Sequence, residues 1–460
     1  MPQPPSAAPR DEPVIRDRGD ACPGALRLHA ADDGHLARVR IPGGLLTTAQ
    51  ALALALAADR FGDGRLELTS RGNVQLRGLP DGCGAGLAEV LDGAGLLPAP
   101  SHERVRNIVA TPLSGLFDDG RPDVAPWVRE LDRLLCASSR AAALSGRFLF
   151  ALDDGRGDVA ALDPDVTVLG RAAGAEDATH APRALVRLGA AADAVKVAAA
   201  DAPRAALLAA LYFLDAAEAA GTRAWRVAEL PAEHAPDTAR FTERLAAAGI
   251  AATAPVHPAW PYAPPPKPWG APAGRYGSLC VLPPLGRATS AQWRILAEAA
   301  ADAPDTDGAP GGLRVTPWRS VVVPRAGSGA AARVEAAGLV LAPDDPWESV
   351  TACTGRPGCA KSLADVRADA LDLVRAARGP LPVHWSGCPR RCGHPRGTAW
   401  VDALATPDGY ELSVHGRRFP HHPDLATALA AARGTPAPAE APPAEAPPTE
   451  AAAIHAAVKK

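Results

Sequence analysis

The sequence has no hydrophobic run long enough to cross a membrane and no large charge of either sign. The longest apolar run, LLTTAQALALALAA at residues 45–58, ends in Asp59 and Arg60 and is shorter than the roughly 20 residues that a spanning helix needs. Residues 1–20 are polar and rich in proline, without the apolar centre of a signal peptide. The net charge of −3 gives no bulk attraction to nucleic acid or membranes. We therefore expect a cytoplasmic protein that binds neither, and in which an anionic ligand would need a local cluster of arginines.

Lysine is scarce, and no G-x-G-x-x-G follows a predicted strand, so the sequence gives no sign of a dinucleotide-binding unit. The chain has 460 residues, of which 47% are hydrophobic. This length is too great for one hydrophobic core and predicts two or three domains. Residues 1–20 and the Pro/Ala-rich tail at 433–460 are predicted to be disordered, and the proline-dense stretch 256–275 is predicted to be a linker.

Cysteine is used in two ways. Four cysteines stand alone and are expected to be ordinary thiols: Cys22, Cys83, Cys136 and Cys280. The other four form two pairs, Cys353 with Cys359 and Cys388 with Cys392. A cubane iron–sulfur cluster needs four thiolates that converge on one small object. The grouping therefore predicts that these four cysteines are the ligands of a 4Fe-4S cluster.

The residues around each pair favour this interpretation. Gly355, Pro357 and Gly358 allow a tight loop in the first pair. The i, i+4 spacing of the second pair would place both sulfurs on one face of a helical turn, with Pro389 at its first position. Four flanking cations would offset the negative charge of a thiolate-ligated cluster: Arg356, Lys361, Arg390 and Arg391.

Three other interpretations of the four cysteines stay open. A structural zinc site is one, although its paired ligands usually have shorter spacings than the five residues between Cys353 and Cys359. Disulfides are another, although nothing marks the chain as secreted. Four unrelated buried thiols are the third, and their grouping with glycine and proline disfavours it.

An internal repeat runs through the chain. LARVRIPGGLLTTAQ at 36–50 corresponds to SLCVLPPLGRATSAQ at 278–292, and each reads as a strand, Pro-x-Gly and a helix start. Thr47-x-x-Gln50 and Thr289-x-x-Gln292 each predict a capping box. The stretches GRLELTSRGNVQLRGLP at 64–80 and GGLRVTPWRSVVVPRAG at 311–327 then correspond as well. Two copies of one unit predict a pseudo-twofold arrangement, with a site at the seam.

Polar residues alternate along the strand predicted at 64–80. Its odd positions are polar and its even positions mostly apolar, so one face is polar. A solvated face is the usual explanation. The run Arg71, Asn73, Gln75 and Arg77 nevertheless has little charge of opposite sign, which favours binding several carboxylates.

Two further segments place arginine beside a predicted strand. Arg104 and Arg106 lie just before one strand, and Arg147 lies at the start of another. Together with the polar strand they predict a cavity lined with basic side chains.

These motifs resemble a known family. C-x5-C followed by C-x3-C is similar to the cluster motif of the siroheme-dependent sulfite and nitrite reductases. GRPGCAKS, HWSGCPRRCGHP, ELTSRGNVQLRGL, ERVRNIVATPLSG and TPWRSVVVP resemble one offshoot of that family, the precorrin-3B synthases, over most of residues 20–430. The resemblance implies an α+β fold in which ferredoxin-like half-domains form a pseudo-twofold repeat, combined with α/β domains, one of which binds the 4Fe-4S cluster.

The same resemblance gives the expected order of domains. The first half-repeat is expected at 21–100, an α/β domain at 101–255, the linker at 256–275, the second half-repeat at 276–335 and the cluster-binding domain at 336–432.

The resemblance also implies an oxidoreductase. Precorrin-3B synthases are oxygen-dependent monooxygenases of aerobic cobalamin biosynthesis that convert precorrin-3A to precorrin-3B with O2 and NADH-derived electrons. They place a hydroxyl group at C20 and close a γ-lactone. The tetrapyrrole would then be a substrate, and its carboxylates explain the arginines. The resemblance implies that the following residues bind it, with Arg71, Arg106 and Arg147 acting in catalysis: Thr69, Arg71, Asn73, Gln75, Arg77, Arg106, Asn107 and Arg147.

One segment departs from the reductases of the family. Their K-F-K-type segment has two lysines, for which this sequence has Arg147 and Leu149. This departure favours the offshoot over the alternative, a siroheme-dependent, ferredoxin-type sulfite or nitrite reductase in which Cys392 would also bridge to the siroheme iron. A cluster-bearing tetrapyrrole carrier without catalytic activity is a third hypothesis.

A mononuclear non-haem iron is also implied by the resemblance. His384 and His394 bracket the second cysteine pair and are candidate ligands, but no complete ligand set is readable. Without a dinucleotide motif, we expect an external electron donor or an NADH-linked reductase.

Overall fold

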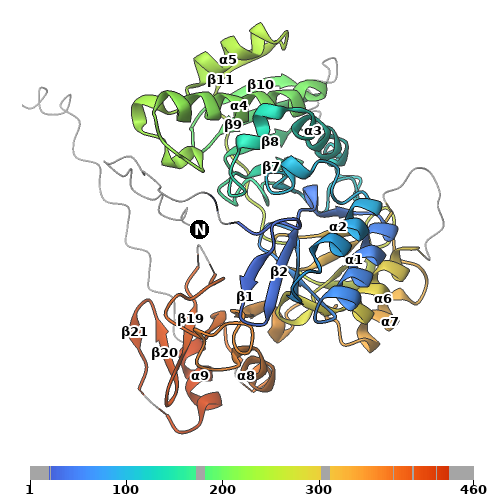
Figure 1. Cartoon of the computed structure of the whole chain (residues 1–460), viewed down its shortest axis with the longest axis vertical. Helices are drawn as coiled ribbons and strands as arrows, with labels where there is room; N and C mark the ends of the chain where they lie inside the picture. Colours follow the sequence, from blue (N-terminus) through green and yellow to red (C-terminus); the bar gives the residue numbers. More distant parts are fainter. Residues whose placement is uncertain are drawn as a thin grey trace, which may run out of the picture.

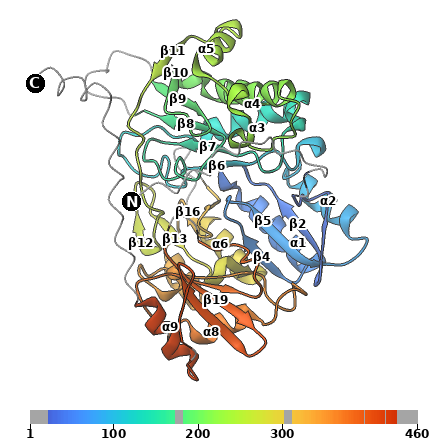
Figure 2. The same ribbon diagram turned by 90° about the vertical axis from the view of Figure 1, so that its left-hand side faces the viewer.

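The computed structural model describes residues 20–434, apart from 21, 172–181, 302–310, 377, 396–397 and 421. The two predicted disordered ends lie almost wholly outside these described residues. Figures 1 and 2 show the two half-repeats together in the middle of the molecule, with an α/β domain on one side and the domain that contains the paired cysteines on the other. The predicted α+β fold class and its pseudo-twofold repeat are confirmed.

The first half-repeat contains five strands and two helices: β1 (His29–Ala31), β2 (Gly34–Val39), β3 (Leu45–Leu46), α1 (Thr48–Phe61), β4 (Arg65–Leu68), β5 (Val74–Leu79) and α2 (Gly84–Gly93). The second contains β12 (Trp269–Ala273), β13 (Ser278–Val281), β14 (Arg287–Thr289), α6 (Ser290–Ala301), β15 (Leu313–Val315), β16 (Val321–Val323) and α7 (Ala330–Ala336). Strand β12 lies inside the stretch that we predicted to be a linker.

Each half-repeat gives one strand to the sheet of the other. The two sheets have the orders β1-β2-β5-β4-β14 and β12-β13-β16-β15-β3. Strand β14 pairs with β4, and β3 pairs with β15, both antiparallel. This exchange makes the two copies a single structural unit.

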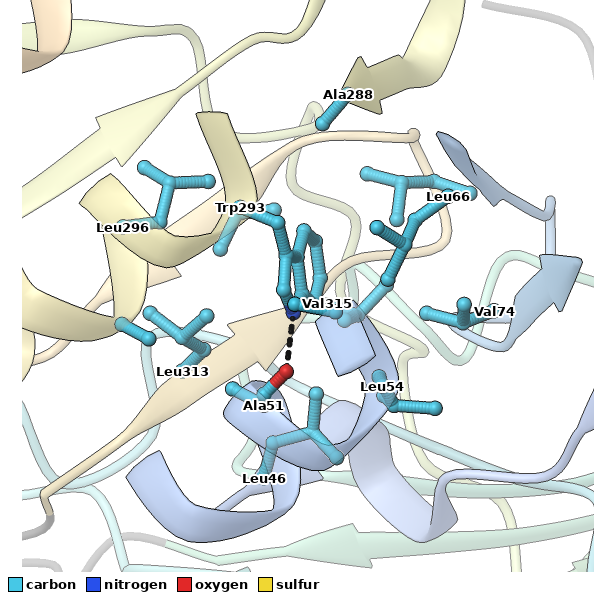
Figure 3. Close-up of a cluster of buried hydrophobic side chains, with 14 of the residues drawn as sticks. Leu46, Ala51, Leu54, Leu66, Val74, Ala288, Trp293, Leu296, Leu313 and Val315 are labelled. Atoms are coloured by element: carbon cyan, nitrogen blue, oxygen red, sulfur yellow. Dashed lines mark hydrogen bonds between the residues drawn. The ribbon is translucent and has the colours of Figure 1, made fainter. Parts of the chain in front are cut away.

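Both predicted capping boxes are present. Thr47 and Gln50 exchange hydrogen bonds of 3.0 and 3.1 Å at the start of α1, and Thr289 and Gln292 exchange bonds of 2.9 and 3.1 Å at the start of α6. The core between these two helices contains Trp293, whose ring nitrogen donates to the backbone oxygen of Ala51 at 3.0 Å (Figure 3). The seam of the repeat is therefore apolar at its centre, where a buried hydrogen bond joins Trp293 to α1.

The strand predicted at 64–80 is a hairpin. Strands β4 and β5 are antiparallel, and the turn between them includes Gly72 with a φ of +66°. The predicted two-faced strand therefore breaks at 69–73, because a left-handed residue cannot continue it.

The α/β domain has a six-stranded sheet of order β11-β10-β9-β8-β7-β6. Its elements are β6 (Ile108–Ala110), α3 (Ala125–Ala137), β7 (Phe150–Asp153), β8 (Val166–Gly170), β9 (Arg183–Leu188), β10 (Ala194–Ala198), α4 (Ala202–Ala219), α5 (Thr238–Ala247) and β11 (Ala252–Val256). Strands β6, β7 and β8 are parallel, and the other pairings are antiparallel.

The C-terminal domain has a sheet of order β17-β18-β19-β20-β21. Its elements are β17 (Val350–Ala352), α8 (Val366–Leu373), β18 (Val383–Ser386), β19 (Val401–Thr406), β20 (Gly409–Val414), β21 (Arg417–Arg418) and α9 (Leu425–Arg433). Strands β17, β18 and β19 are parallel, while β19 and β20 form the hairpin predicted around Pro407 and Asp408. In the described part of the chain, no helix is long and apolar enough to cross a membrane.

Candidate functional site

The two cysteine loops begin at the same edge of one sheet. Cys353 directly follows β17, and Cys388 lies two residues after β18. Because these strands are adjacent and parallel, their carboxyl ends meet. The backbone nitrogen of Gly387 donates to Sγ of Cys353 at 3.2 Å, and that of Cys353 donates to the oxygen of Trp385 at 2.9 Å. The fold thus brings the first cysteine of one pair beside the loop of the other.

The electrostatics agree with this proximity. Burial raises the pKa of Cys353, and the charges of Cys388 and Cys392 raise it further. Cys388 is buried, Cys353 and Cys359 are partly buried, Cys392 is exposed, and all four are free thiols. Three of the four predicted ligands are therefore close enough to influence one another.

The four thiols do not form a single-ion site. Across the described ranges, no group of three or more Cys, His, Asp or Glu side chains is arranged to hold one metal ion. A zinc ion would need four donors at about 2.0–2.3 Å from one point. A cubane places each thiolate on a different iron, so its four ligands need not meet at one point.

The helical turn predicted for the second pair is wrong. Residues 387–393 form turns rather than a helix, and Arg391 has a φ of +48°. A left-handed residue ends a right-handed helix, so the i, i+4 argument does not apply. A loop nevertheless puts Cys388 and Cys392 on the same side of the domain as Cys353.

We expected the four flanking cations to offset the negative charge of a cluster, and two of them pair with groups of the protein. The guanidinium of Arg391 donates to the carboxylate of Asp402, and Nε of Arg356 donates to the backbone oxygen of Ser362 at 2.8 Å. Lys361 and Arg390 are exposed. Arg356 and Arg391 therefore stabilise the cysteine loops.

Neither predicted histidine belongs to a ligand set in the described residues. His384 is fully buried, its Nδ1 lies 2.8 Å from Oγ1 of Thr351, and its Nε2 has no described partner. Burial, with help from Arg319 and His394, lowers the pKa of His384 to about 3, so this ring is neutral. His394 is exposed and stacks on Trp400, whose ring also meets His384 edge-on.

The first half-repeat holds the first cysteine loop directly. Arg77 donates from Nη2 to the backbone oxygen of Gly358 at 2.8 Å, and it forms a forked pair with Asp33 at 2.9 and 2.8 Å. Asp32 accepts from the backbone nitrogen of Ala360. Arg77 therefore contacts the first cysteine loop, which the sequence did not indicate.

A second connection passes through two residues that the sequence analysis missed. Nη1 of Arg367 lies 2.6 Å from Glu67, and its Nε donates to the backbone oxygen of Cys353 at 3.1 Å. Burial would raise the pKa of Glu67, but Arg367, Arg287 and Arg77 outweigh it, so the pKa lies below its usual value. Glu67 is thus ionised, and it links β4 to the cysteine loop.

Four of the predicted substrate-binding residues form hydrogen bonds within the protein. Oδ1 of Asn73 accepts from the nitrogen of Ile41 at 2.9 Å, and its Nδ2 donates to Asn107. Asn107 donates to the oxygen of Phe148 at 3.0 Å. Gln75 donates to Glu67, and Oγ1 of Thr69 accepts from the nitrogens of Asn73 and Arg71. Four side chains thereby connect β5 to its neighbouring strands and to the α/β domain: Thr69, Asn73, Gln75 and Asn107.

Arg106 is buried in an ion pair. Its Nε and Nη2 each lie 2.7 Å from an oxygen of Asp132, and its Nη1 donates to the oxygen of Leu96. In this forked geometry the guanidinium of Arg106 is occupied by a carboxylate and a backbone oxygen. Its assignment as a substrate-binding or catalytic residue therefore has no support from its contacts.

Arg71 and Arg147 lie together, as the sequence predicted. Arg71 donates to the backbone oxygens of Gly146 and Arg147, both at 3.1 Å. Burial, with the nearby charge of Arg226, lowers the pKa of Arg71 to about 10, so it stays charged. Arg147 is exposed, and its guanidinium carbon lies 5.5 Å from the ring centre of Trp225.

Two arginines were missed, Arg38 on β2 and Arg40 directly after this strand. Arg38 donates to Gln75 at 2.9 Å and Arg40 to the backbone oxygen of Arg104 at 3.2 Å. Nε of Arg38 and Nη1 of Arg40 are buried and, among the described residues, have no partner. Burial, with Arg38 and Arg71 nearby, lowers the pKa of Arg40 to about 9. The alternation of both arginines with Ala37, Val39 and Ile41 could have revealed them.

The chain is similar to proteins of one family over most of its length. The family profile described as "Nitrite/Sulfite reductase ferredoxin-like half domain" matches residues 29–89. A precorrin-3B synthase from Sinorhizobium sp is 28% identical over 418 residues, which cover 88% of this chain and 84% of that protein. A ferredoxin–nitrite reductase from Leptolyngbya laminosa is 35% identical over 105 residues, 21% of this chain and 20% of that protein.

The fold is shared with a solved structure. The NirA protein of Mycobacterium tuberculosis superimposes with a TM-score of 0.62 at 21% identity, over 86% of this chain and 79% of that chain. The half-domain match, the common fold and the long alignment with precorrin-3B synthase agree with one another. The chain thus shares the fold of the nitrite and sulfite reductases and is similar over most of its length to a precorrin-3B synthase.

Proposed function

We propose that the protein is a precorrin-3B synthase, an oxidoreductase that uses O2 to convert precorrin-3A to precorrin-3B in aerobic cobalamin biosynthesis. The observation that supports this best is the group of partly or fully buried arginines Arg38, Arg40 and Arg71, none of which has a carboxylate partner among the described residues. A buried cation without a counter-ion is costly. A polycarboxylate ring would supply the missing anions.

The role of these arginines is to bind and orient. Forked guanidinium groups fix a carboxylate in distance and in angle. Arg147, exposed above Trp225, adds a cation beside Arg71. Several such contacts around one ring would hold its reacting carbon in a defined place.

Cys353, Cys359, Cys388 and Cys392 are the proposed ligands of a 4Fe-4S cluster. Three observations fit such a group. The thiols are free, a backbone N–H donates to Sγ of Cys353, and the two cysteine loops meet at one edge of a sheet. When bound, the cluster supplies electrons one at a time. The free thiols also suit a reducing compartment, and the cytoplasm remains part of the proposal.

The reaction needs a co-reactant that the chain does not contain. One atom of O2 enters the substrate as the hydroxyl group at C20. The other atom is reduced to water, which consumes two electrons and two protons. An external donor or an NADH-linked reductase would supply the electrons. The described residues offer no ligand set for a mononuclear non-haem iron, so the proposal assigns it none.

The siroheme-dependent alternative is not favoured. Leu149 is 3% exposed and packs against Val109, Ala151 and Val159. At this position an apolar side chain can neither bind nor protonate sulfite or nitrite. The alignment with the nitrite reductase from Leptolyngbya laminosa also covers far less of both proteins than the alignment with precorrin-3B synthase.

The test is product formation from isotopically labelled oxygen. Anaerobically purified protein is mixed with precorrin-3A, a reducing system and 18O2, and the product is analysed by mass spectrometry. We expect one labelled oxygen atom in the product and no reaction under argon. Reduction of nitrite or sulfite by the purified protein, without hydroxylation of precorrin-3A, would overturn the proposal in favour of the alternative.

A further inference from the structure

The two copies of the internal repeat differ at a turn position that carries no charge in the first copy and a charged side chain in the second. In the first copy, Thr69 opens a turn in which its backbone nitrogen donates to the oxygen of Asn73 at 2.9 Å. In the second copy, Thr316 donates to Ser320 at the same distance, and Oγ1 accepts from two backbone nitrogens in both turns. Gly72 therefore corresponds to Arg319.

Both residues have the same left-handed backbone. The φ of Gly72 is +66° and that of Arg319 is +62°. Glycine adopts this conformation without penalty, whereas a side chain such as that of arginine is strained there. Strained residues of this kind tend to be found at functional sites, so the arginine at this position needs an explanation.

The surrounding backbone leaves room for this side chain. A Cβ placed on Gly286 would lie 2.8 Å from Cβ and 2.9 Å from Cδ of Arg319. A Cβ placed on Gly393 would lie 3.3 Å from Nη2 of Arg319 and 3.9 Å from Cε1 of His384. The guanidinium therefore reaches from the second half-repeat to the loop that follows Cys392.

The guanidinium of Arg319 has no anion of its own. Among the described residues it forms no hydrogen bond and no ion pair. Burial lowers its pKa, the nearby Arg367 lowers it further, and Glu67 opposes both. Glu67 already binds Arg367 and Gln75, so it cannot neutralise Arg319 as well.

We propose that Arg319 binds a carboxylate of the tetrapyrrole substrate, at the side of the ring nearest the Cys388–Cys392 loop. This inference rests on the proposed function. It assigns the second half-repeat a direct part in substrate binding, whereas Arg38, Arg40 and Arg71 belong to the first. The two copies of the repeat would then hold the ring from both sides of their seam.

A structural role predicts the opposite effect of mutation. When a residue stabilises the fold, its removal lowers the stability of the protein. A strained cation without a partner should cost stability, so that its removal leaves the protein as stable or more so. Arg319→Gly, which installs the residue of the first copy, separates the two explanations.

The experiment measures binding and thermal stability on the full-length protein. The probe is uroporphyrin, a tetrapyrrole polycarboxylate, titrated by absorbance under anaerobic conditions. The variants are Arg319→Gly, Arg319→Gln and Arg319→Lys, and the matched control is Arg333→Gln, since Arg333 is exposed on α7 of the same half-repeat. We expect binding about tenfold weaker or more in the Gly and Gln variants, intermediate in the Lys variant and unchanged in the control.

The stability result is equally specific. We expect Arg319→Gly to melt at the wild-type temperature or above it. A melting temperature more than about 4 °C lower, or failure to fold, would show a structural role and overturn the inference. Undiminished binding in Arg319→Gly and Arg319→Gln would also overturn it, and would leave the proposed function intact. If the wild-type protein binds no uroporphyrin and no precorrin-3A, the proposed function fails and the inference with it.

Discussion

Nη2 of Arg77 donates to the backbone oxygen of Gly358 at 2.8 Å. Arg77 lies on β5 of the first half-repeat, and Gly358 is the residue before Cys359. Strand β5, which lies beside Arg38, Arg40 and Arg71, is thereby fixed to a loop that holds a ligand of the proposed cluster. A shift of either element would be transmitted to the other through one buried guanidinium.

Arg77→Gln should destabilise the protein and loosen the first cysteine loop. The side chain of Arg77 is 6% exposed and that of Asp33 is 21% exposed, so the change leaves a largely buried carboxylate without its partner. We expect a loss of about 3 kcal/mol in the free energy of unfolding, measured with urea, and faster bleaching of the cluster in air. Arg60→Gln on α1, an exposed position, should change the stability by less than about 0.5 kcal/mol. Equal stability of the two variants would contradict the link.

Cys388→Ala should lose the iron–sulfur cluster and much of the protein's solubility, because metal binding and folding are coupled. Iron and acid-labile sulfide per chain are the quantities to measure. The control is Cys136→Ala, since Cys136 lies on α3 outside the motif. Soluble Cys388→Ala protein with the iron content of the wild type would show that this cysteine is not a ligand.

Trp293→Phe tests the seam of the repeat. The substitution removes the 3.0 Å bond to Ala51 at the centre of the core in Figure 3. We expect the free energy of unfolding to fall by about 1–3 kcal/mol. Trp127→Phe is a control, because Trp127 is partly exposed and its ring nitrogen has no hydrogen bond to another described residue. An unchanged urea midpoint in Trp293→Phe would count against a close-packed seam.

Asp158 should make the stability depend on pH. Burial, with Asp153 close by, raises its pKa to about 7, above the value of about 3.9 expected in the unfolded chain. Between these two values the folded protein keeps a proton that the unfolded chain has released. The contribution of Asp158 to the free energy of unfolding is therefore fully present below about pH 4. It is lost as the pH rises towards 7, and the loss is at most about 4 kcal/mol.

Asp158→Asn should remove this dependence. The amide oxygen can still accept from Oγ1 of Thr111, now 2.7 Å from Asp158, but it cannot ionise. Urea unfolding at about pH 5 and about pH 8 should show a smaller difference in the variant than in the wild type. Asp408→Asn, in the exposed hairpin turn, should behave as the wild type does. A pH profile of Asp158→Asn identical to that of the wild type would refute the assignment.

The parts of the fold that sequence predicted are those set by local chemistry. The capping boxes depend on residues three positions apart, such as Thr47 and Gln50, and the hairpin at Pro407 and Asp408 depends on a turn. The paired cysteines stand out by their own spacing and their neighbours, and their role as cluster ligands stays a prediction. Such features can be read directly because the interacting groups are close in the sequence.

The parts that sequence missed depend on distant partners. Arg106 was predicted to bind the substrate, and in the structure it pairs with Asp132, which lies on α3, 26 residues further along the chain. Arg77 reaches Gly358 across most of the chain, and the left-handed φ of Arg391 ends the helix predicted for its loop. Nothing in the residues beside these arginines indicates which acceptor each will meet.

The central claim is that four cysteines hold a cubane beside a group of arginines that binds a free tetrapyrrole. The most direct test is the absorption spectrum of anaerobically purified protein, recorded together with its iron content. We predict a brown protein with a broad sulfur-to-iron band, at least about four iron atoms per chain and no porphyrinoid. A sharp Soret band that survives purification, or an iron content near zero, would contradict the account.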